Sequence, residues 1–149
     1  MTIAAILNSK ADHSSGQSVI SVEPDMEISA VLTTLAEHRI GAVLVCQGDA
    51  LVGIVSERDI VRALEKEGAA ILTKSAKALM TADPVTVERD ETAPKAMQLM
   101  TDGRFRHLPV VENGKLVGLV TLGDVVRKRI EDAEREAEEM RAYVSAPPA

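Results

Sequence analysis

The hydrophobic and polar positions of the chain follow two patterns, one typical of helices and the other of strands. In residues 28–36 apolar positions recur every three or four residues, which places them on one face of a helix. Residues 42–46 form an unbroken apolar run, as expected for a strand that is buried on both faces. A turn at 48–49 and a second apolar run at 51–55 predict a hairpin, and a β-rich run at 19–22 predicts a short first strand.

The same succession of elements occurs twice, because the chain repeats itself at one constant offset that pairs position 53 with position 118 and position 59 with position 124. The offset needs no insertion or deletion from residue 22 to residue 62, and it pairs 51–53 with the identical Leu-Val-Gly at 116–118. In the second copy, Asn113-Gly114 is a strong signal for a two-residue hairpin turn. Two copies of about 60 residues indicate a duplicated unit rather than a solenoid.

Each copy predicts the order strand, helix, strand, strand, helix, and the last helix begins at Ser56 or Thr121. We therefore expect a mixed α/β (α+β) fold in which the two repeats pack as a pseudo-twofold pair, since neither is large enough to cover a sheet face alone. The expected divisions are an N-terminal helix and loop at 1–17, the first repeat at 18–68, a connector with a helical turn at 69–82, the second repeat at 83–129, and a C-terminal helix with a frayed tail at 130–149.

The C-terminal segment carries a heptad pattern of its own. From Val126 onward, apolar residues recur at alternating spacings of four and three, and the residues between them are almost all charged. A helix with this seam could pack on its own domain, but its extension past the second repeat favours a partner helix or another subunit. We therefore expect a homodimer. The seam consists of Val126, Ile130, Ala133, Ala137, Met140 and Val144.

Composition and charge argue against several kinds of partner. The formal net charge is −6 and the only aromatic residues are Phe105 and Tyr143, so the chain lacks the basic stripe and the stacking platforms of a nucleic-acid-binding protein. No apolar run approaches the ~20 residues that a membrane span needs, and a signal peptide is not expected. The single cysteine, Cys46, lies in an apolar run and is expected to be a buried, inert thiol in a cytoplasmic protein.

Catalytic and metal-binding patterns are weak. The histidines His13, His38 and His107 do not have a metal-ligand spacing, and no metal is expected. Ser56 has no recognisable base partner, and the chain contains neither a Walker-type loop nor a G-x-G-x-x-G element. We therefore do not expect an enzyme.

A motif shared by the two copies carries the main functional signal. It reads Gly-Ile-Val-Ser-Glu-Arg-Asp at 53–59 and Gly-Leu-Val-Thr-Leu-Gly-Asp at 118–124. A Ser or Thr followed three residues later by an acid, at a helix start, is a capping box and needs no ligand. Found at the end of a hairpin and twice in one register, the motif resembles that of the cystathionine β-synthase (CBS) domain pair, or Bateman module. The stretch 104–111 is similar to the mid-domain segment of the same family, and the resemblance covers residues 3–129.

The resemblance implies a cleft between the copies that binds an adenine nucleotide such as AMP, ADP, ATP or NAD(H). It implies that Asp59 and Asp124 accept hydrogen bonds from ribose hydroxyls, and that Ser56 and Thr121 contact phosphate at the two helix N-termini. Each site is expected to be completed by the other copy. The Asp124 site would take Ser21, Ile40, Gly41 and Ala42, and the Asp59 site would take Thr86, Phe105, Arg106 and His107.

Three residues are candidate phosphate cations, namely Arg58, Arg106 and His107. At the positions of Arg106 and His107 the first copy has Gly41 and Ala42, so the two sites are expected to differ. The favoured function is a regulatory nucleotide sensor that acts on an unidentified partner protein in trans, without catalysis. The alternative is a structural dimerisation adaptor whose cleft is vestigial.

Overall fold

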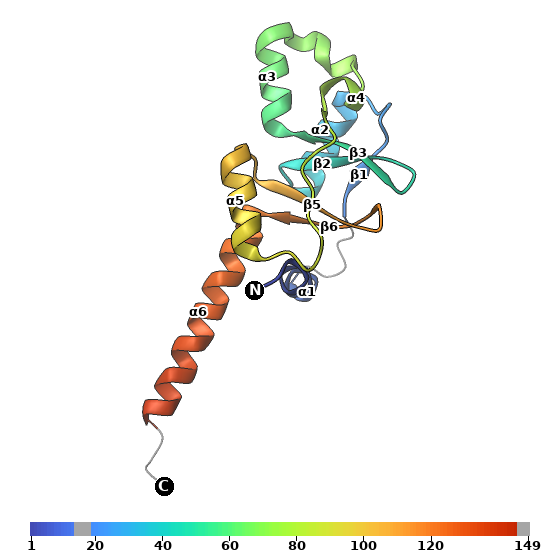
Figure 1. Cartoon of the computed structure of the whole chain (residues 1–149). Coiled ribbons are helices and arrows are strands. Elements are labelled where there is room, and N and C mark those ends of the chain that lie inside the picture. The colour runs from blue at the N-terminus through green and yellow to red at the C-terminus, as the bar shows by residue number, and fades with distance from the viewer. Residues whose placement is uncertain (14–18, 146–149) are drawn as a thin grey trace.

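The computed structural model describes residues 1–13 and 19–145 and confirms the mixed α/β architecture (Figure 1). Each repeat contains the predicted hairpin with a helix on either side of it in the sequence. The first repeat consists of β1 (Ser21–Val22), α2 (Ile28–His38), β2 (Ala42–Gln47), β3 (Ala50–Ser56) and α3 (Glu57–Glu67). The second repeat consists of α5 (Ala93–Gly103), β5 (His107–Glu112), β6 (Lys115–Thr121) and α6 (Leu122–Ser145).

Four elements lie outside this repeated order. The N-terminal helix α1 (Ile3–His13) precedes the first repeat, and the connector contains the 3-10 helix η1 (Gly68–Thr73), α4 (Ala76–Leu79) and β4 (Thr81–Ala82). The helical turn around residue 76 was predicted, but β4 was not. A two-residue strand has too few positions to show a period, and β4 is defined only by its antiparallel pairing with β3.

The two hairpins have matching registers and lie one above the other in Figure 1. Each has one register shift, between Val45 and Cys46 in β2 and between Val110 and Val111 in β5, which are equivalent positions. The repeats differ at their first strand. In the first repeat β1 pairs in parallel with β2, whereas in the second repeat this strand is reduced to the single parallel bridge Val87↔Val110.

The backbone turns before each hairpin are also duplicated. The helices α2 and α5 end at Arg39 and Arg104, whose φ angles of 53° and 57° lie in the left-handed region. This cap reverses the chain and directs it into β2 and β5. A non-glycine residue rarely adopts this conformation, so its occurrence at two equivalent arginines is a feature of the repeat.

The N-terminal helix completes the second repeat, and the connector completes the first. The Ile3 N–H donates to the Glu91 carbonyl at 2.9 Å, and the Ala76 N–H donates to the Met26 carbonyl at 2.7 Å. The acceptors Met26 and Glu91 are separated in the sequence by the repeat offset, but the donors Ile3 and Ala76 are further apart than that offset. Each repeat is thus completed by the segment that precedes the other, and the offset that relates the repeats does not reveal this exchange.

The glycine of the shared motif lets the completing segment approach its hairpin. A Cβ atom at Gly118 would lie 2.9 Å from Leu7 Cδ2 of α1, and one at Gly53 would lie 2.9 Å from the Thr81 carbonyl oxygen. Neither position has room for a side chain, so the motif glycines have a packing role that is independent of any ligand.

Each repeat has a buried core of its own. The first core includes Ile28, Val43 and Val55 together with Ile71 and Ala76 of the connector. The second includes Met100, Leu108 and Val120 together with Ile3 and Ile6 of α1. Neither repeat covers its sheet face alone, as expected, but the covering segment is not the other repeat. Each sheet face is covered within its own half, by a segment borrowed from elsewhere in the chain, and the halves then meet through β3 and β6.

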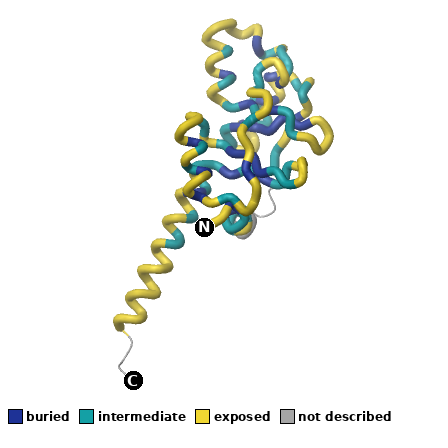
Figure 2. The backbone as a smooth tube through the Cα atoms, viewed as in Figure 1, coloured by how far each residue is buried: buried dark blue, intermediate teal, exposed yellow. Residues whose placement is uncertain are grey.

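The C-terminal helix α6 leaves this body after its first turns (Figure 1) and is exposed along most of its length (Figure 2). The apolar seam residues Ile130, Met140 and Val144 are 54%, 63% and 75% exposed, so they do not pack on the helix's own domain. Within the described residues no helix is both long and apolar enough to cross a membrane.

Candidate functional site

Two cavities lie between the repeats, and each contains one of the shared Asp residues. The Asp59 cavity has a volume of about 550 Å³ and the Asp124 cavity a volume of about 760 Å³, both in the usual range for small-molecule sites. The start of α3 and residues 103–107 line the first, and the start of α6 and residues 38–42 line the second. These two walls are equivalent at the repeat offset, so the cavities are related by the pseudo-twofold axis.

The carboxylate of the Asp59 cavity closes a complete capping box at the start of α3. Its Oδ2 accepts hydrogen bonds from the Ser56 N–H and the Ser56 hydroxyl, both at 2.9 Å. The Asp59 N–H donates in return to Ser56 Oγ at 3.2 Å. Among the described residues, the hydrogen bonds to this carboxylate all end on Oδ2, so Oδ1 can accept from a ligand.

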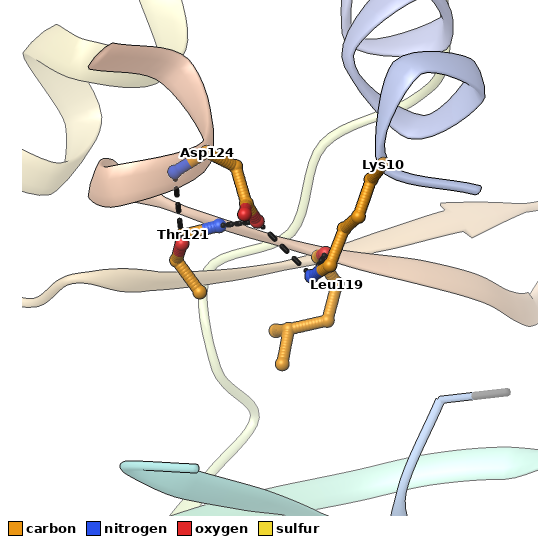
Figure 3. A network of polar contacts seen from close by, with 4 residues as sticks. All are labelled: Lys10, Leu119, Thr121 and Asp124. Atoms are coloured by element: carbon orange, nitrogen blue, oxygen red, sulfur yellow. Dashed lines mark hydrogen bonds and ion pairs between the residues drawn. The ribbon is translucent and has the colours of Figure 1, made fainter. Parts of the chain in front are cut away.

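The carboxylate of the Asp124 cavity has the same box and one additional partner (Figure 3). Its Oδ2 accepts from the Thr121 N–H at 2.9 Å, and the Asp124 N–H donates to Thr121 Oγ1 at 3.1 Å. The additional partner is Lys10 of α1, whose Nζ lies 3.0 Å from the same Oδ2 and donates to the Leu119 carbonyl at 3.1 Å. The Asp124 side chain is 11% exposed, so this is a largely buried end of an ion pair.

Most of the predicted site residues line these cavities. Ser56, Arg58, Asp59, Phe105, Arg106 and His107 line the Asp59 cavity, and Ile40, Gly41, Ala42, Thr121 and Asp124 line the Asp124 cavity. Their role in binding a nucleotide stays a prediction.

Two predicted residues, Ser21 and Thr86, are exposed and lie outside both linings. The preceding residues Ile20 and Val85 line the Asp124 and Asp59 cavities instead. Successive side chains of an extended segment point to opposite faces, so neighbouring residues differ in whether they face a cavity. Ser21 and Thr86 are equivalent in the repeat, and their role in binding a nucleotide stays a prediction.

Ser21 has a different partner, since its side chain hydrogen-bonds the Cys46 thiol of β2. Burial raises the pKa of Cys46 above its ordinary value, and this hydrogen bond only partly opposes the effect. A thiol with a raised pKa is a poor nucleophile, as the sequence predicted for Cys46.

His107 and Gly41 line both cavities and contact each other between them. A Cβ atom at Gly41 would lie 3.4 Å from both Cε1 and Nε2 of the imidazole. Burial lowers the pKa of His107 below its ordinary value, and the cation of Lys10 lowers it further. The imidazole is therefore mainly neutral at pH 7, and only Arg58 and Arg106 of the three candidate phosphate cations carry a full charge there.

Several charged lining residues were missed by the sequence analysis. Arg39, Arg62 and Arg127 line the cavities. Each is identical to its equivalent in the other repeat, with Arg39 matching Arg104 of the predicted charged segment, so the repeat itself was a signal for them. Lys10 lies outside the repeated segment, so no sequence signal connected it with Asp124.

The arrangement suits an anionic ligand that also carries hydroxyl donors. A helix N-terminus with its free N–H groups favours an anion, arginines add positive charge, and a carboxylate accepts from hydroxyls. In the part of the chain that the structure describes, no group of three His, Cys, Asp or Glu side chains is placed to hold a metal ion.

Comparison with known proteins gives consistent matches. The sequence model of the CBS domain matches residues 16–66 and 76–131. A solved CBS-domain protein of Agrobacterium tumefaciens is 40% identical with a TM-score of 0.80, over 87% of this chain and 99% of that one. The protein CBSX2, solved in complex with AMP, is 31% identical with a TM-score of 0.68, over 78% of this chain and 91% of that one.

The mitochondrial CBS domain-containing protein CBSX3 of Arabidopsis thaliana is 32% identical over 148 residues, which are 96% of this chain and 71% of that protein. Other CBS domain-containing proteins of the same plant are 34–36% identical, but this chain spans only 20–21% of their length. Because the family model matches both repeats and the solved neighbours share the paired fold, the chain belongs to the CBS-domain family.

Proposed function

We propose that the chain is a regulatory sensor that binds an adenine nucleotide between its repeats and acts on a partner protein in trans, without catalysis. The candidate ligands are AMP, ADP, ATP and NAD(H), and a cytoplasmic setting belongs to the same proposal. One observation carries it: each cavity brings together a helix N-terminus, a carboxylate with an open oxygen, and arginines from both repeats. The AMP complex of CBSX2, a relative with the same fold, supports the choice of ligand.

Capping and ribose binding are compatible in this proposal. Oδ2 of each Asp holds the helix start, while Oδ1 accepts from a ribose hydroxyl. The phosphate end would lie at the helix N-terminus. There the Thr121 hydroxyl hydrogen is not committed to Asp124, whereas the Ser56 hydroxyl donates to Asp59 and must rotate to reach a phosphate.

Calorimetric titration tests this function directly. The protein is first unfolded to release any carried ligand, which mass spectrometry identifies, and is then refolded and titrated with AMP, ADP, ATP and NADH. At least one is expected to bind with a Kd in the micromolar range, about −8 kcal/mol. It should also stabilise the fold by about 2.7 kcal/mol at a hundredfold excess over Kd. Flat titrations with all four would contradict the proposal.

The dimerisation adaptor is the second candidate, and α6 is the observation that favours it. Most helical stability in proteins comes from packing of an apolar face, so the exposed apolar seam indicates a covering partner. We propose that the partner is a second copy. In a parallel pair, Arg129 faces Glu134 of the second copy and Glu136 faces its Arg141. An antiparallel pair with full overlap would instead place Glu134 opposite Glu134.

Light scattering tests the dimer. The chain has a mass of 15.9 kDa, so a dimer is expected at twice that value, and the mass of a single chain at high concentration would contradict it. Reversing the flanking charges with Glu134→Arg and Glu136→Arg should weaken a parallel dimer, because both cross-helix pairs become repulsive. A dimer combined with flat nucleotide titrations would favour the adaptor over the sensor.

A further inference from the structure

The apolar linings of the two cavities match at three equivalent positions and differ at a fourth. The fourth position lies just before the second strand of each hairpin, where the Asp59 cavity has Phe105 and the Asp124 cavity has Ile40. The chain contains one phenylalanine, one tyrosine and no tryptophan, and Tyr143 is 81% exposed on α6. Phe105 therefore supplies the one benzene ring in the described linings. The three matched pairs are Ile54 and Leu119, Pro84 and Val19, and Val85 and Ile20.

The ring of Phe105 occupies space that only a glycine at position 103 leaves open. A Cβ atom at Gly103 would overlap Cε1 of the ring and lie 2.6 Å from Cδ1, far inside van der Waals contact. The equivalent residue of the first repeat is His38, whose side chain would exclude a ring placed in this way. Gly103 and Phe105 are thus a pair, and the first repeat has neither member of it.

The backbone gives no other reason for a glycine at this position. Gly103 is the last residue of α5, and the left-handed cap that follows it is formed by Arg104, with a φ of 57°. Gly103 itself is not among the glycines with a positive φ. A glycine in a helix is less favourable than alanine, so its contact with the Phe105 ring explains its presence.

The ring is held in place before any ligand arrives. The Phe105 N–H donates to the Met100 carbonyl at 3.0 Å, and the Arg104 carbonyl accepts from Arg58 Nη1 of α3 at 2.9 Å. The Phe105 side chain is half-buried and packs against the second core. A binding surface that is already ordered loses little conformational entropy when a ligand binds.

We infer that the base of the nucleotide stacks on Phe105 in the Asp59 cavity, and that Gly103 is the positioning residue that seats the ring. The inference rests on the proposed nucleotide function and assigns a specificity to one of the two cavities. Stacking on an aromatic side chain is favourable for any base. The Asp59 cavity is therefore expected to draw a large share of its affinity from the base.

The Asp124 cavity offers a weaker stacking surface. The equivalent of Phe105 is the aliphatic Ile40, and the equivalent of Gly103 is His38, which is exposed and has a smaller ring. His107 lines both cavities, so its imidazole does not distinguish them. The Asp124 cavity is therefore expected to bind a nucleotide mainly through its ribose and phosphate.

Calorimetry with AMP and ribose 5-phosphate tests the role of Phe105, because the two ligands differ in the base. In the Asp124→Glu background, which weakens the other cavity, Phe105→Ile copies the wall of that cavity. It should weaken AMP about tenfold and ribose 5-phosphate much less. Phe105→Tyr keeps a benzene ring and should keep the preference for AMP. Tyr143→Ile is the matched control and should change neither affinity, because its ring lies outside both linings.

A double-mutant cycle tests Gly103. Gly103→Ala places a Cβ atom where the edge of the ring lies, so the ring must move, and AMP should weaken about as much as in Phe105→Ile. In the Phe105→Ile background no ring is present, so Gly103→Ala should cause no further loss. Full AMP affinity in Gly103→Ala alone, or a further loss of similar size without the ring, would show that Gly103 does not act through Phe105.

Transfer of the pair tests the difference between the cavities. In the Asp59→Glu background, His38→Gly combined with Ile40→Phe should strengthen AMP relative to ribose 5-phosphate at the Asp124 cavity. No gain would show that this pair does not separate the two cavities.

The outcomes distinguish this inference from the function on which it rests. If Phe105→Ile changed AMP and ribose 5-phosphate equally, or changed neither, the stacking role would fail while the sensor function would stand. If Asp124→Glu removed all AMP binding, the Asp59 cavity would take no nucleotide, and again only the inference would fall. If wild type bound no nucleotide, the proposed function itself would fail. Should Phe105→Ile unfold on thermal melting, equal losses of AMP and ribose 5-phosphate in Gly103→Ala would overturn the inference.

Discussion

The Asp59 and Asp124 cavities are two copies of one site, and they differ mainly in what reaches them from outside the shared motif. The capping boxes and the walls at 38–42 and 103–107 are equivalent. The second residue of the helix that follows each hairpin differs between the two repeats. Arg58 reaches across to the Arg104 carbonyl at 2.9 Å, whereas the equivalent residue of α6 is Gly123. The Asp59 cavity is thus bridged by a side chain of its own helix, and the other cavity is not.

The Asp124 cavity is bridged instead from α1, through Lys10. Duplication preserved the parts that a repeat builds alone, namely the cap, the hairpin and the wall. It did not preserve the parts supplied by the completing segments, because α1 and the connector are different sequences. The comparison teaches that two sites with one motif differ through the segments that the motif does not include.

The largest test of this comparison removes the support that α1 gives to the second repeat. Ile3 is fully buried in the second core, so Ile3→Ala should lower the free energy of unfolding by about 2–5 kcal/mol. The measurement is urea denaturation. Val61→Ala, at an exposed position of α3, is the control and should stay within about 0.5 kcal/mol. A similar small loss for Ile3→Ala would mean that α1 is not part of the second core.

Lengthening the two acids tests whether they do more than cap. Glutamate is the preferred acid of a capping box, so Asp59→Glu and Asp124→Glu should keep the fold. The extra methylene displaces Oδ1 from the position that a ribose requires. Loss of good geometry in one charge-assisted hydrogen bond should weaken nucleotide binding about tenfold or more. Calorimetry together with thermal melting separates the two effects. Mutants that bound as tightly as wild type would show that both acids are helix caps only.

The local parts of this site were predictable from sequence, since caps, turns and buried strands depend on neighbouring residues. The repeat offset is sufficient to locate both capping boxes and both walls, through residues such as Gly41 and His107. The face of an extended segment was not predictable in the same way. Ser21 and Thr86 are the predicted residues, whereas Ile20 and Val85 line the cavities, because extended segments this short show no alternation of apolar and polar positions.

The contacts of α1 with the second repeat could not be predicted from the sequence. The docking of α1 on the second repeat depends on backbone hydrogen bonds such as Ile3 to Glu91, and backbone groups leave no mark on side-chain patterns. The Lys10 ion pair follows from that docking. Its two residues are 114 positions apart, and neither shows a charge pattern that indicates the other.

Removing Arg106 tests the charged wall that distinguishes the second repeat from the first, where Gly41 is equivalent. In the Asp124→Glu background, Arg106→Ala should weaken AMP at the Asp59 cavity by up to about tenfold and change adenosine much less, because only AMP presents an anion. Calorimetry with both ligands gives the ratio. Arg135→Ala, an exposed position on α6, is the control. Equal losses for AMP and adenosine would show that Arg106 does not contact phosphate.

The smallest expected effect concerns His107, which belongs to both cavities. Burial lowers the pKa of its imidazole, Lys10 and Arg106 lower it further, and Glu57 and Asp124 oppose them. The unfolded chain has the ordinary histidine pKa of about 6.5 and therefore binds this proton more readily than the folded chain. The stability that comes from the neutral imidazole is fully present above about pH 6.5 and is lost as the pH falls through that value towards the lower folded pKa. Urea denaturation between about pH 7.5 and 5.5 should show wild type losing more stability than His107→Gln, which has no such group to titrate. Equal losses of stability in the two proteins would mean that His107 is not held neutral between the cavities.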